Sequence, residues 1–182
     1  PIRSAEVLEK LETLRNELIG AGAAKEVAAA NYPITSDKGW NGGFGWPGKD
    51  PLQNPHFNIM HVTREYAETV GLKFIQGKSF SQFTTKNSRY IIINESALDL
   101  MGMENPIGQK VTWDLPHFDQ PMELTIVGVV KDIIKESPYK NTSPAIITNM
   151  HWDVSELFIR LNPNIKTREA LSAVEKVFAT IV

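Results

Sequence analysis

The spacing of hydrophobic residues first predicts two amphipathic helices, one near each end of the chain. In residues 5–19 the apolar positions recur every three or four residues, which places them on one helical face. A second stripe of this kind follows Asn164. The two stripes consist of Val7, Leu11, Leu14 and Leu18, and of Leu171, Val174, Val177 and Phe178.

Between these helices, short runs rich in apolar residues predict strands. The predicted strands are Lys25–Asn31, Phe57–Val62, Tyr90–Ile93, Lys110–Trp113, Glu123–Val130, Pro144–Asn149 and Glu156–Leu161. Two short helices, Thr63–Val70 and Glu95–Met101, lie among them; Thr63 and Asn94 are the expected N-caps, and Gly71 and Gly102 the expected ends. This irregular alternation predicts an α+β fold with mixed sheets and short helices.

Residues 32–55, here called the aromatic loop, break this pattern because glycine and proline recur throughout the segment. Such turn chemistry predicts a long loop, and loops of this length are commonly functional. Its residues Trp40, Phe44 and Trp46 are candidates for contact with a sugar ring, a membrane interface or a protein partner. The more frequent alternative is local packing beneath their own loop. We hypothesise that the three lie on or near a contact surface.

Composition narrows the functional classes. The 182 residues suit one domain or two small subdomains, and 42% are apolar and 22% charged. A net charge of −2 argues against a strongly basic nucleic-acid binder, and the absence of cysteine excludes a disulfide scaffold or a thiolate nucleophile. No run approaches the roughly 20 apolar residues of a transmembrane helix. Because the chain begins with proline rather than methionine, we expect it to be part of a longer protein.

Motifs for nucleotide binding or catalysis are absent or incomplete. Residues 43–48 match the letters GxGxxG, but no predicted strand precedes them and prolines prevent the helix that should follow. Residues 71–79 are one residue too long for a phosphate-binding loop. Isolated candidates for metal or acid–base chemistry are His56, His61, His117, His151, Asp114, Asp119 and Asp132. Their spacing brings no ligand set or catalytic pair together, so we predict no catalytic, cofactor or metal site.

Four stretches of the middle of the chain follow one another in a specific order. They are Val62–Leu72 with Gly77–Phe80, Ile91–Ala97 with Met101–Gly102, Asn105–Val111, and Ile126–Asp132. In this order and spacing, residues 57–149 resemble the MacB-like periplasmic core domain. That domain is the ectodomain of FtsX/MacB-type ABC transporter permeases.

The resemblance implies a single extracytoplasmic domain over residues 1–182, without catalytic chemistry of its own. An α/β, porter-like subdomain would be built from residues 1–56 and 150–182, and a β-rich core from residues 57–149. The domain would lie on the periplasmic side of the bacterial inner membrane, between two transmembrane helices of the permease. Its implied partners are a cytoplasmic ABC ATPase, a second permease copy, and a periplasmic protein or lipoprotein. No nucleic acid is expected, and the isolated domain is expected to be a monomer.

The motif residues are expected to have structural roles. They are Gly71, Gly77, Asn94, Glu95, Asn105, Pro106, Gly108, Gly128 and Asp132. Asn94 would cap a helix, residues 105–108 would form a turn, and Gly128 within a strand indicates a bulge or close backbone approach. Two features depart from the family: it usually adds a strand after the last helix, and the aromatic loop matches none of its motifs.

Two other functional classes stay open on the sequence alone. One is a soluble periplasmic carbohydrate- or peptide-binding module that uses the aromatic loop. The other is a small hydrolase, which requires Asp, His and Ser side chains to converge in a pocket.

Overall fold

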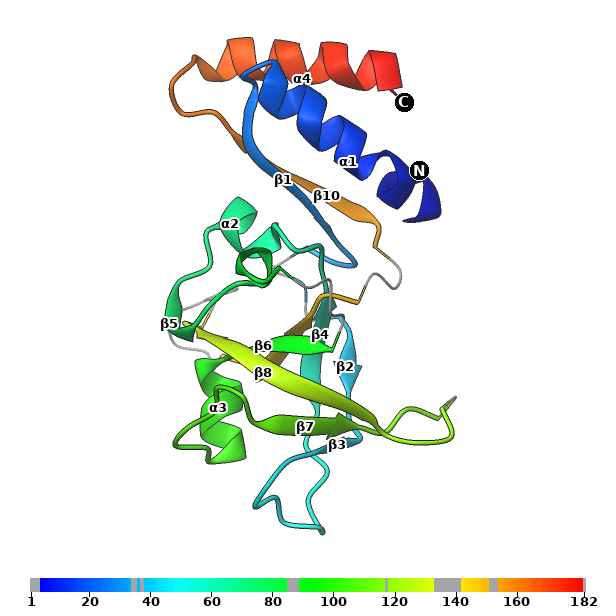
Figure 1. Ribbon diagram of the computed structural model, residues 1–182, viewed down its shortest axis with the longest axis vertical. Helices are drawn as coiled ribbons and strands as arrows, with labels where there is room; N and C mark the ends of the chain where they lie inside the picture. The colour runs from blue at the N-terminus through cyan, green and yellow to red at the C-terminus, as the bar shows by residue number, and fades with distance from the viewer. Residues whose placement is uncertain are drawn as a thin grey trace.

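Both ends of the chain meet in one small unit (Figure 1). The computed structural model describes residues 4–33, 36, 38–84, 89–116, 118–132, 142–150 and 154–181. The unit contains α1 (Ser4–Gly20), β1 (Ala24–Ala30), β10 (Glu156–Leu161) and α4 (Thr167–Ile181). β1 and β10 pair antiparallel, and both helices pack on the same face of the pair. Fully buried Leu18 lies in this interface, where burial of one such side chain is worth about 1.5–3 kcal/mol.

Strand β1 is buried on both faces, which explains its unusual alanine content. Val27 and Ala29 belong to the core beneath α1 and α4, whereas Ala28 and Ala30 face Tyr66 of α2 (Tyr66–Val70). Elements on both sides can approach the strand closely because its side chains are small. Alanine is a poor strand former by itself, and here the packing on both faces overrides that preference.

The middle of the chain forms a second, larger sheet. In the described residues its strand order is β2-β4-β9-β6-β8-β7-β3, and β5 also pairs with β8. The strands are β2 (Trp40–Asn41), β3 (Phe44–Gly45), β4 (Phe57–His61), β5 (Phe74–Gly77), β6 (Tyr90–Asn94), β7 (Lys110–Trp113), β8 (Met122–Val130) and β9 (Ala145–Thr148). The pairs β4–β9 and β6–β8 are parallel and the others antiparallel. The helix α3 (Glu95–Met101) and the 3-10 helix η1 (Phe80–Gln82) complete this region. The predicted α+β fold class is therefore confirmed.

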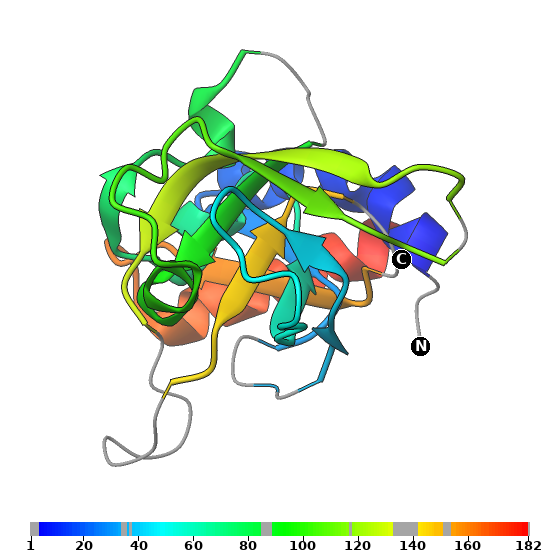
Figure 2. The same ribbon diagram turned by 90° about the horizontal axis from the view of Figure 1, so that it is seen from below.

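The larger sheet curls until its two ends come together, as the view along the long axis indicates (Figure 2). β2 and β3 lie at opposite ends of the strand order, yet Gly42 and Gly43 alone separate them in sequence. Gly43 has a φ of +81°, and a Cβ there would lie 2.6 Å from the Asp114 carbonyl oxygen. Apolar side chains from the inner face, among them Ile93 and Leu124, fill the space that the curl encloses.

Three local predictions differ from the structure. The aromatic loop contains β2 and β3, because its short extended segments find partners in β4 and β7. The predicted strands did not include Phe74–Gly77, which forms β5 against β8. The helix expected from Thr63 begins at Tyr66, and the Thr63 hydroxyl instead accepts a hydrogen bond from the Ala29 N–H at 2.9 Å.

Candidate functional site

Residues 46–55 of the aromatic loop form the end of the molecule opposite the two termini (Figure 1). Just before them, Phe44 is buried, with 1% of its surface exposed. Its ring stacks on Trp113 at a centroid distance of 5.0 Å and meets Phe57 edge-on at 5.3 Å. Phe44 therefore fixes the end of the curled sheet and has almost no surface to offer a partner.

Trp46 also anchors the aromatic loop. Its Nε1 donates a hydrogen bond to the Met101 carbonyl at 3.1 Å, and its ring meets Phe57 edge-on at 5.9 Å. Lys49 strengthens the anchor, since its Nζ lies 5.3 Å from the Trp46 ring centroid and donates to the Phe44 carbonyl at 2.6 Å. These contacts hold the loop against the body of the domain.

In the described part of the aromatic loop, the exposed large hydrophobic side chains are those of Trp40 and Leu52. Trp40 is 44% exposed and Leu52 is 94% exposed. Leu52 was not selected from the sequence. The pattern that could have identified it is a single leucine within the otherwise polar and proline-containing residues 50–55. We call Trp40 and Leu52 the distal hydrophobic pair. A contact role for the aromatic loop stays a prediction, and these two side chains are the ones available for it.

Asn94 is the centre of a polar cluster that joins β6, α3, β8 and β9. Its Oδ1 accepts hydrogen bonds from the Ala97 N–H at 3.0 Å and the Ala145 N–H at 2.8 Å. Its Nδ2 donates to Asp132 Oδ1 at 2.6 Å and to the Ser143 carbonyl at 2.9 Å. The side chain thus makes two donor and two acceptor bonds, which is the full capacity of an amide. The predicted N-cap is confirmed.

Asp132 and Glu95 complete this Asn94–Asp132 cluster. The Asp132 carboxylate accepts from the Ser96 N–H at 3.0 Å and from the Ser96 hydroxyl at 2.6 Å. The Asp132 N–H in turn donates to Glu95 Oε2 at 2.9 Å. These hydrogen bonds join Asp132, which follows β8, to the end of β6 and the start of α3. Asp132 therefore has a structural role.

Three motif glycines occupy positions that a larger residue would disturb. Gly71 follows α2 with a φ of +75°. A Cβ at Gly77 would lie 2.2 Å from the Val127 carbonyl oxygen, and one at Gly128 would lie 2.6 Å from the Phe74 ring. β5 and β8 therefore approach each other at a distance that glycine permits, as the sequence indicated for Gly128.

The motif from Asn105 to Gly108 forms a turn that leads into β7. The Gln109 N–H donates to the Pro106 carbonyl at 3.1 Å, and the Gly108 N–H donates to the Ile126 carbonyl at 2.8 Å. Pro106 is buried and Asn105 is exposed. The turn attaches the beginning of β7 to the middle of β8.

Of the histidines, His56 and His61 lie in the described part of the chain. His56 is exposed, and His61 Nδ1 lies 2.8 Å from the Thr148 hydroxyl. His117 and His151 fall outside the described residues. Over the described ranges, no group of three or more His, Cys, Asp or Glu residues is placed to hold a metal ion. Across the same ranges, every helix is too short or too polar to cross a membrane.

The family model of the MacB-like periplasmic core domain matches residues 5–177. This match extends over nearly the whole chain. The chain belongs to the MacB-like periplasmic core domain family. The suggested resemblance is therefore confirmed, and it extends well beyond residues 57–149. A search of curated proteins gave no significant match.

Solved structures agree with this family at the level of the fold. The periplasmic region of MacB from Actinobacillus actinomycetemcomitans has a TM-score of 0.62 at 14% identity, covering 93% of this chain and 73% of that one. A domain of a putative permease protein from Porphyromonas gingivalis gives 0.58 at 12%, with 88% and 71% covered. The extracellular domain of the noncanonic ABC-type transporter YknZ from Gram-positive bacteria gives 0.52 at 16%, with 89% and 76% covered.

Membership makes this MacB-like domain a periplasmic domain of an ABC transporter permease, and the structural relatives support an extracytoplasmic location. It does not favour the alternative of a free carbohydrate- or peptide-binding module.

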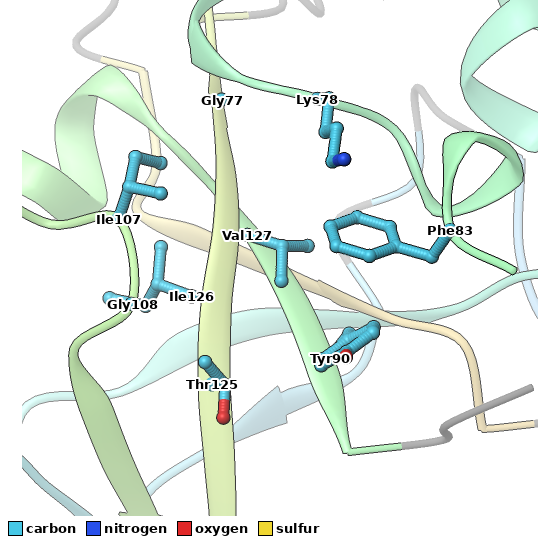
Figure 3. Close-up of a pocket in the computed structure, with 9 residues that line it drawn as sticks. All are labelled: Gly77, Lys78, Phe83, Tyr90, Ile107, Gly108, Thr125, Ile126 and Val127. Atoms are coloured by element: carbon cyan, nitrogen blue, oxygen red, sulfur yellow. The ribbon is translucent and has the colours of Figure 1, made fainter. Parts of the chain in front are cut away.

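One feature of the domain had no signal in the sequence: an apolar groove over β8 with Lys78 and Phe83 in its wall (Figure 3). Its residues come from separate elements that the fold alone brings together.

Proposed function

We propose that this domain links ATP-driven movement of its permease to the handling of a substrate or partner outside the cytoplasm, without catalysis of its own. The expected ATPase is a separate cytoplasmic domain or subunit, and a second permease copy completes the transporter. The observation that carries the proposal is the arrangement of the domain, in which α1 and α4 lie at one end and the loop that follows β3 lies at the other (Figure 1).

The terminal unit is suited to receive movement from two membrane helices at once. α1 and α4 share one apolar core on the β1–β10 pair. Lys10 Nζ of α1 also donates to the Ile181 carbonyl of α4 at 2.9 Å. A displacement of either helix would therefore move the whole unit.

Direct hydrogen bonds connect this unit to the curled sheet. The Thr63 N–H donates to the Ala29 carbonyl at 2.9 Å, and the Ala29 N–H donates to the Thr63 hydroxyl at the same distance. Ala30 and Val62 form an antiparallel bridge beside them. This joint of Ala29, Ala30, Val62 and Thr63 is a short route by which the terminal unit would move β4 and the sheet beyond it.

The distal hydrophobic pair is the surface we assign to the partner. We expect the double substitution Trp40→Ala with Leu52→Ser to reduce transport by the full-length permease at least several-fold while ATP hydrolysis continues. Interface anchors of this kind commonly cost more than 1 kcal/mol when truncated. Transport and ATP hydrolysis should be measured separately on the same reconstituted complex.

The matched control is Leu100→Ser, a change at a leucine 43% exposed on α3. We expect it to leave transport unchanged. All variants should keep the melting temperature of the domain within a few degrees, because exposed substitutions usually change stability by less than about 0.5 kcal/mol. Normal transport by the double variant would contradict a role for the distal hydrophobic pair.

The sequence of the complete protein provides a separate test. We expect apolar stretches of about 20 residues on both sides of the present chain, as membrane helices require. A secreted protein without such stretches would instead support the free binding module.

A further inference from the structure

An apolar groove of about 450 Å³ lies over β8, at the place where β5 and the Asn105–Gly108 turn approach this strand (Figure 3). Ile126 and Val127 line it from β8, and Lys78 and Ile107 from its walls. This volume falls in the range of about 300–1,000 Å³ that is typical of small-molecule sites. Ile107 remains 44% exposed there.

The backbone beneath the groove is already hydrogen-bonded. The Val127 carbonyl accepts from the Lys78 N–H at 3.0 Å, and the Ile126 carbonyl accepts from the Gly108 N–H at 2.8 Å. The two walls are thus attached to adjacent residues of β8, one to Val127 and the other to Ile126. Because these carbonyls are satisfied, the groove presents mainly side-chain carbon to a ligand, and its shape is formed before binding.

Two aromatic rings form one side of the groove. Phe83 and Tyr90 lie with their ring centroids 4.7 Å apart, tilted by 46°. Arg64 holds the chain before them, since its Nη2 donates to the Phe83 carbonyl and to the Phe80 carbonyl. Rigid aromatic surface of this kind favours a flat or chain-like apolar ligand.

The unpaired charge at the groove is positive. Lys78 Nζ lies 4.4 Å from the centroid of the Phe83 ring, and within the described ranges no carboxylate forms an ion pair with it. At Thr125, the hydroxyl accepts from Lys110 Nζ at 2.9 Å, and Glu123 balances that lysine at 2.9 Å. Lys78 therefore carries the uncompensated positive charge of this site, beside apolar surface.

We propose that this groove binds an amphiphilic carboxylate. Its single apolar chain or ring system lies over Val127, between the aromatic side and Ile107, and its carboxylate pairs with Lys78. An apolar body matches the lining, and an anionic head complements the ammonium. A cation would be repelled by Lys78, and a sugar would leave its hydroxyls without partners along the apolar walls.

Binding of dodecanoate below its micelle-forming concentration tests this site, with the 182-residue chain in a calorimetric titration. We expect one molecule bound per chain. Lys78→Gln should weaken binding by about three- to five-fold, the size of a partly exposed ion pair. Lys25→Gln, at an exposed lysine of β1, should leave the affinity unchanged. Dodecanol, which has the same chain and no charge, should be insensitive to Lys78→Gln.

Two substitutions inside the groove complete the experiment. Thr125→Phe should fill the space and abolish binding. Ile107→Glu places a carboxylate on an exposed side chain at the wall and should repel the ligand even if Thr125→Phe fails to fold. Absence of dodecanoate binding, or equal affinity in the wild type, Lys78→Gln and Ile107→Glu, would overturn the proposal. Dimers that form with rising concentration and exclude dodecanoate would assign the groove to a second copy and also overturn it.

Discussion

At the scale of single residues, the Asn94–Asp132 cluster explains why an amide stands where the β6 strand becomes a helix. Asn94 must accept two N–H groups and also donate to a carboxylate and a carbonyl. Aspartate would supply the acceptors but no donor, and it would place a second negative charge beside Asp132. Serine or threonine would cap the helix but could not reach four partners. The choice of residue therefore reflects the junction of four elements rather than the cap alone.

Asn94→Asp should consequently destabilise the domain by about 3 kcal/mol, since it removes two buried hydrogen bonds and adds repulsion. Chemical denaturation at neutral pH measures the change in the free energy of unfolding. Asn105→Asp makes the same chemical change in an exposed turn and should cost less than about 0.5 kcal/mol. Equal effects at both positions would contradict the role given to the cluster.

At the scale of elements, α1 is attached to β1 by charge as well as by apolar packing. Arg15 of α1 donates from Nε and Nη2 to the two carboxylate oxygens of Glu26, at 2.5 and 2.9 Å. Burial raises the pKa of Glu26, but the hydrogen bonds from Arg15 and from the Val27 N–H outweigh this and leave its pKa below the ordinary value. The geometry is that of a bidentate pair, which fixes the register of the helix on the strand.

The lowered pKa of Glu26 determines the direction in which the stability of the domain changes with pH. Near and below pH 4.5, the ordinary value for this group, the unfolded chain binds the proton more readily than the folded one. The pair's contribution to stability is therefore present above that pH and is lost as the pH falls through the folded-state pKa. Thermal unfolding between pH 6 and 3 should show a shallower acid decline for Glu26→Gln than for the wild type. Glu17→Gln, at an exposed position of α1, is the matched control.

At the scale of the whole molecule, the joint of Ala29, Ala30, Val62 and Thr63 connects the two sheets. Thr63 is 4% exposed and takes part in both hydrogen bonds with Ala29. α2 packs against β1 and β10 next to this joint, where the Tyr66 ring meets Phe158 edge-on at 5.2 Å. In the proposed coupling, movement at the termini would pass to the sheet through this small, buried contact.

Thr63→Val tests the joint because valine keeps the shape but leaves the Ala29 N–H without its partner. We expect a loss of about 1–3 kcal/mol in the free energy of unfolding. Thr112→Val, at an exposed threonine of β7, should change it by less than about 0.5 kcal/mol. Hydrogen exchange should accelerate at Ala29 more than in the interior of β8. Unchanged exchange at Ala29 would show that the bond to Thr63 does not hold the two sheets.

The sequence by itself determined most of the local elements of this protein, and it also indicated the family to which the chain belongs. Helical periodicity predicted α1 and α4, the cap at Asn94 and the stop at Gly102 predicted α3, and Glu156–Leu161 was predicted with the same bounds as β10. The caps at Asn94, Gly71 and Gly102 were also predicted, since they depend on interactions within a few residues. The four motif stretches supplied the resemblance to permease periplasmic domains, which the family match confirmed.

Tertiary structure alone decided what the aromatic loop does and where a ligand could bind. β2 and β3 exist because their short segments meet β4 and β7, and the closure of the sheet buries Phe44 while Trp40 stays exposed. Composition could not separate these two aromatic residues, which lie four positions apart. The groove beside Lys78 likewise depends on backbone approaches between segments about 20 to 50 residues apart. Periodicity and capping report interactions along the chain, whereas burial and convergence are set by which distant segments pair.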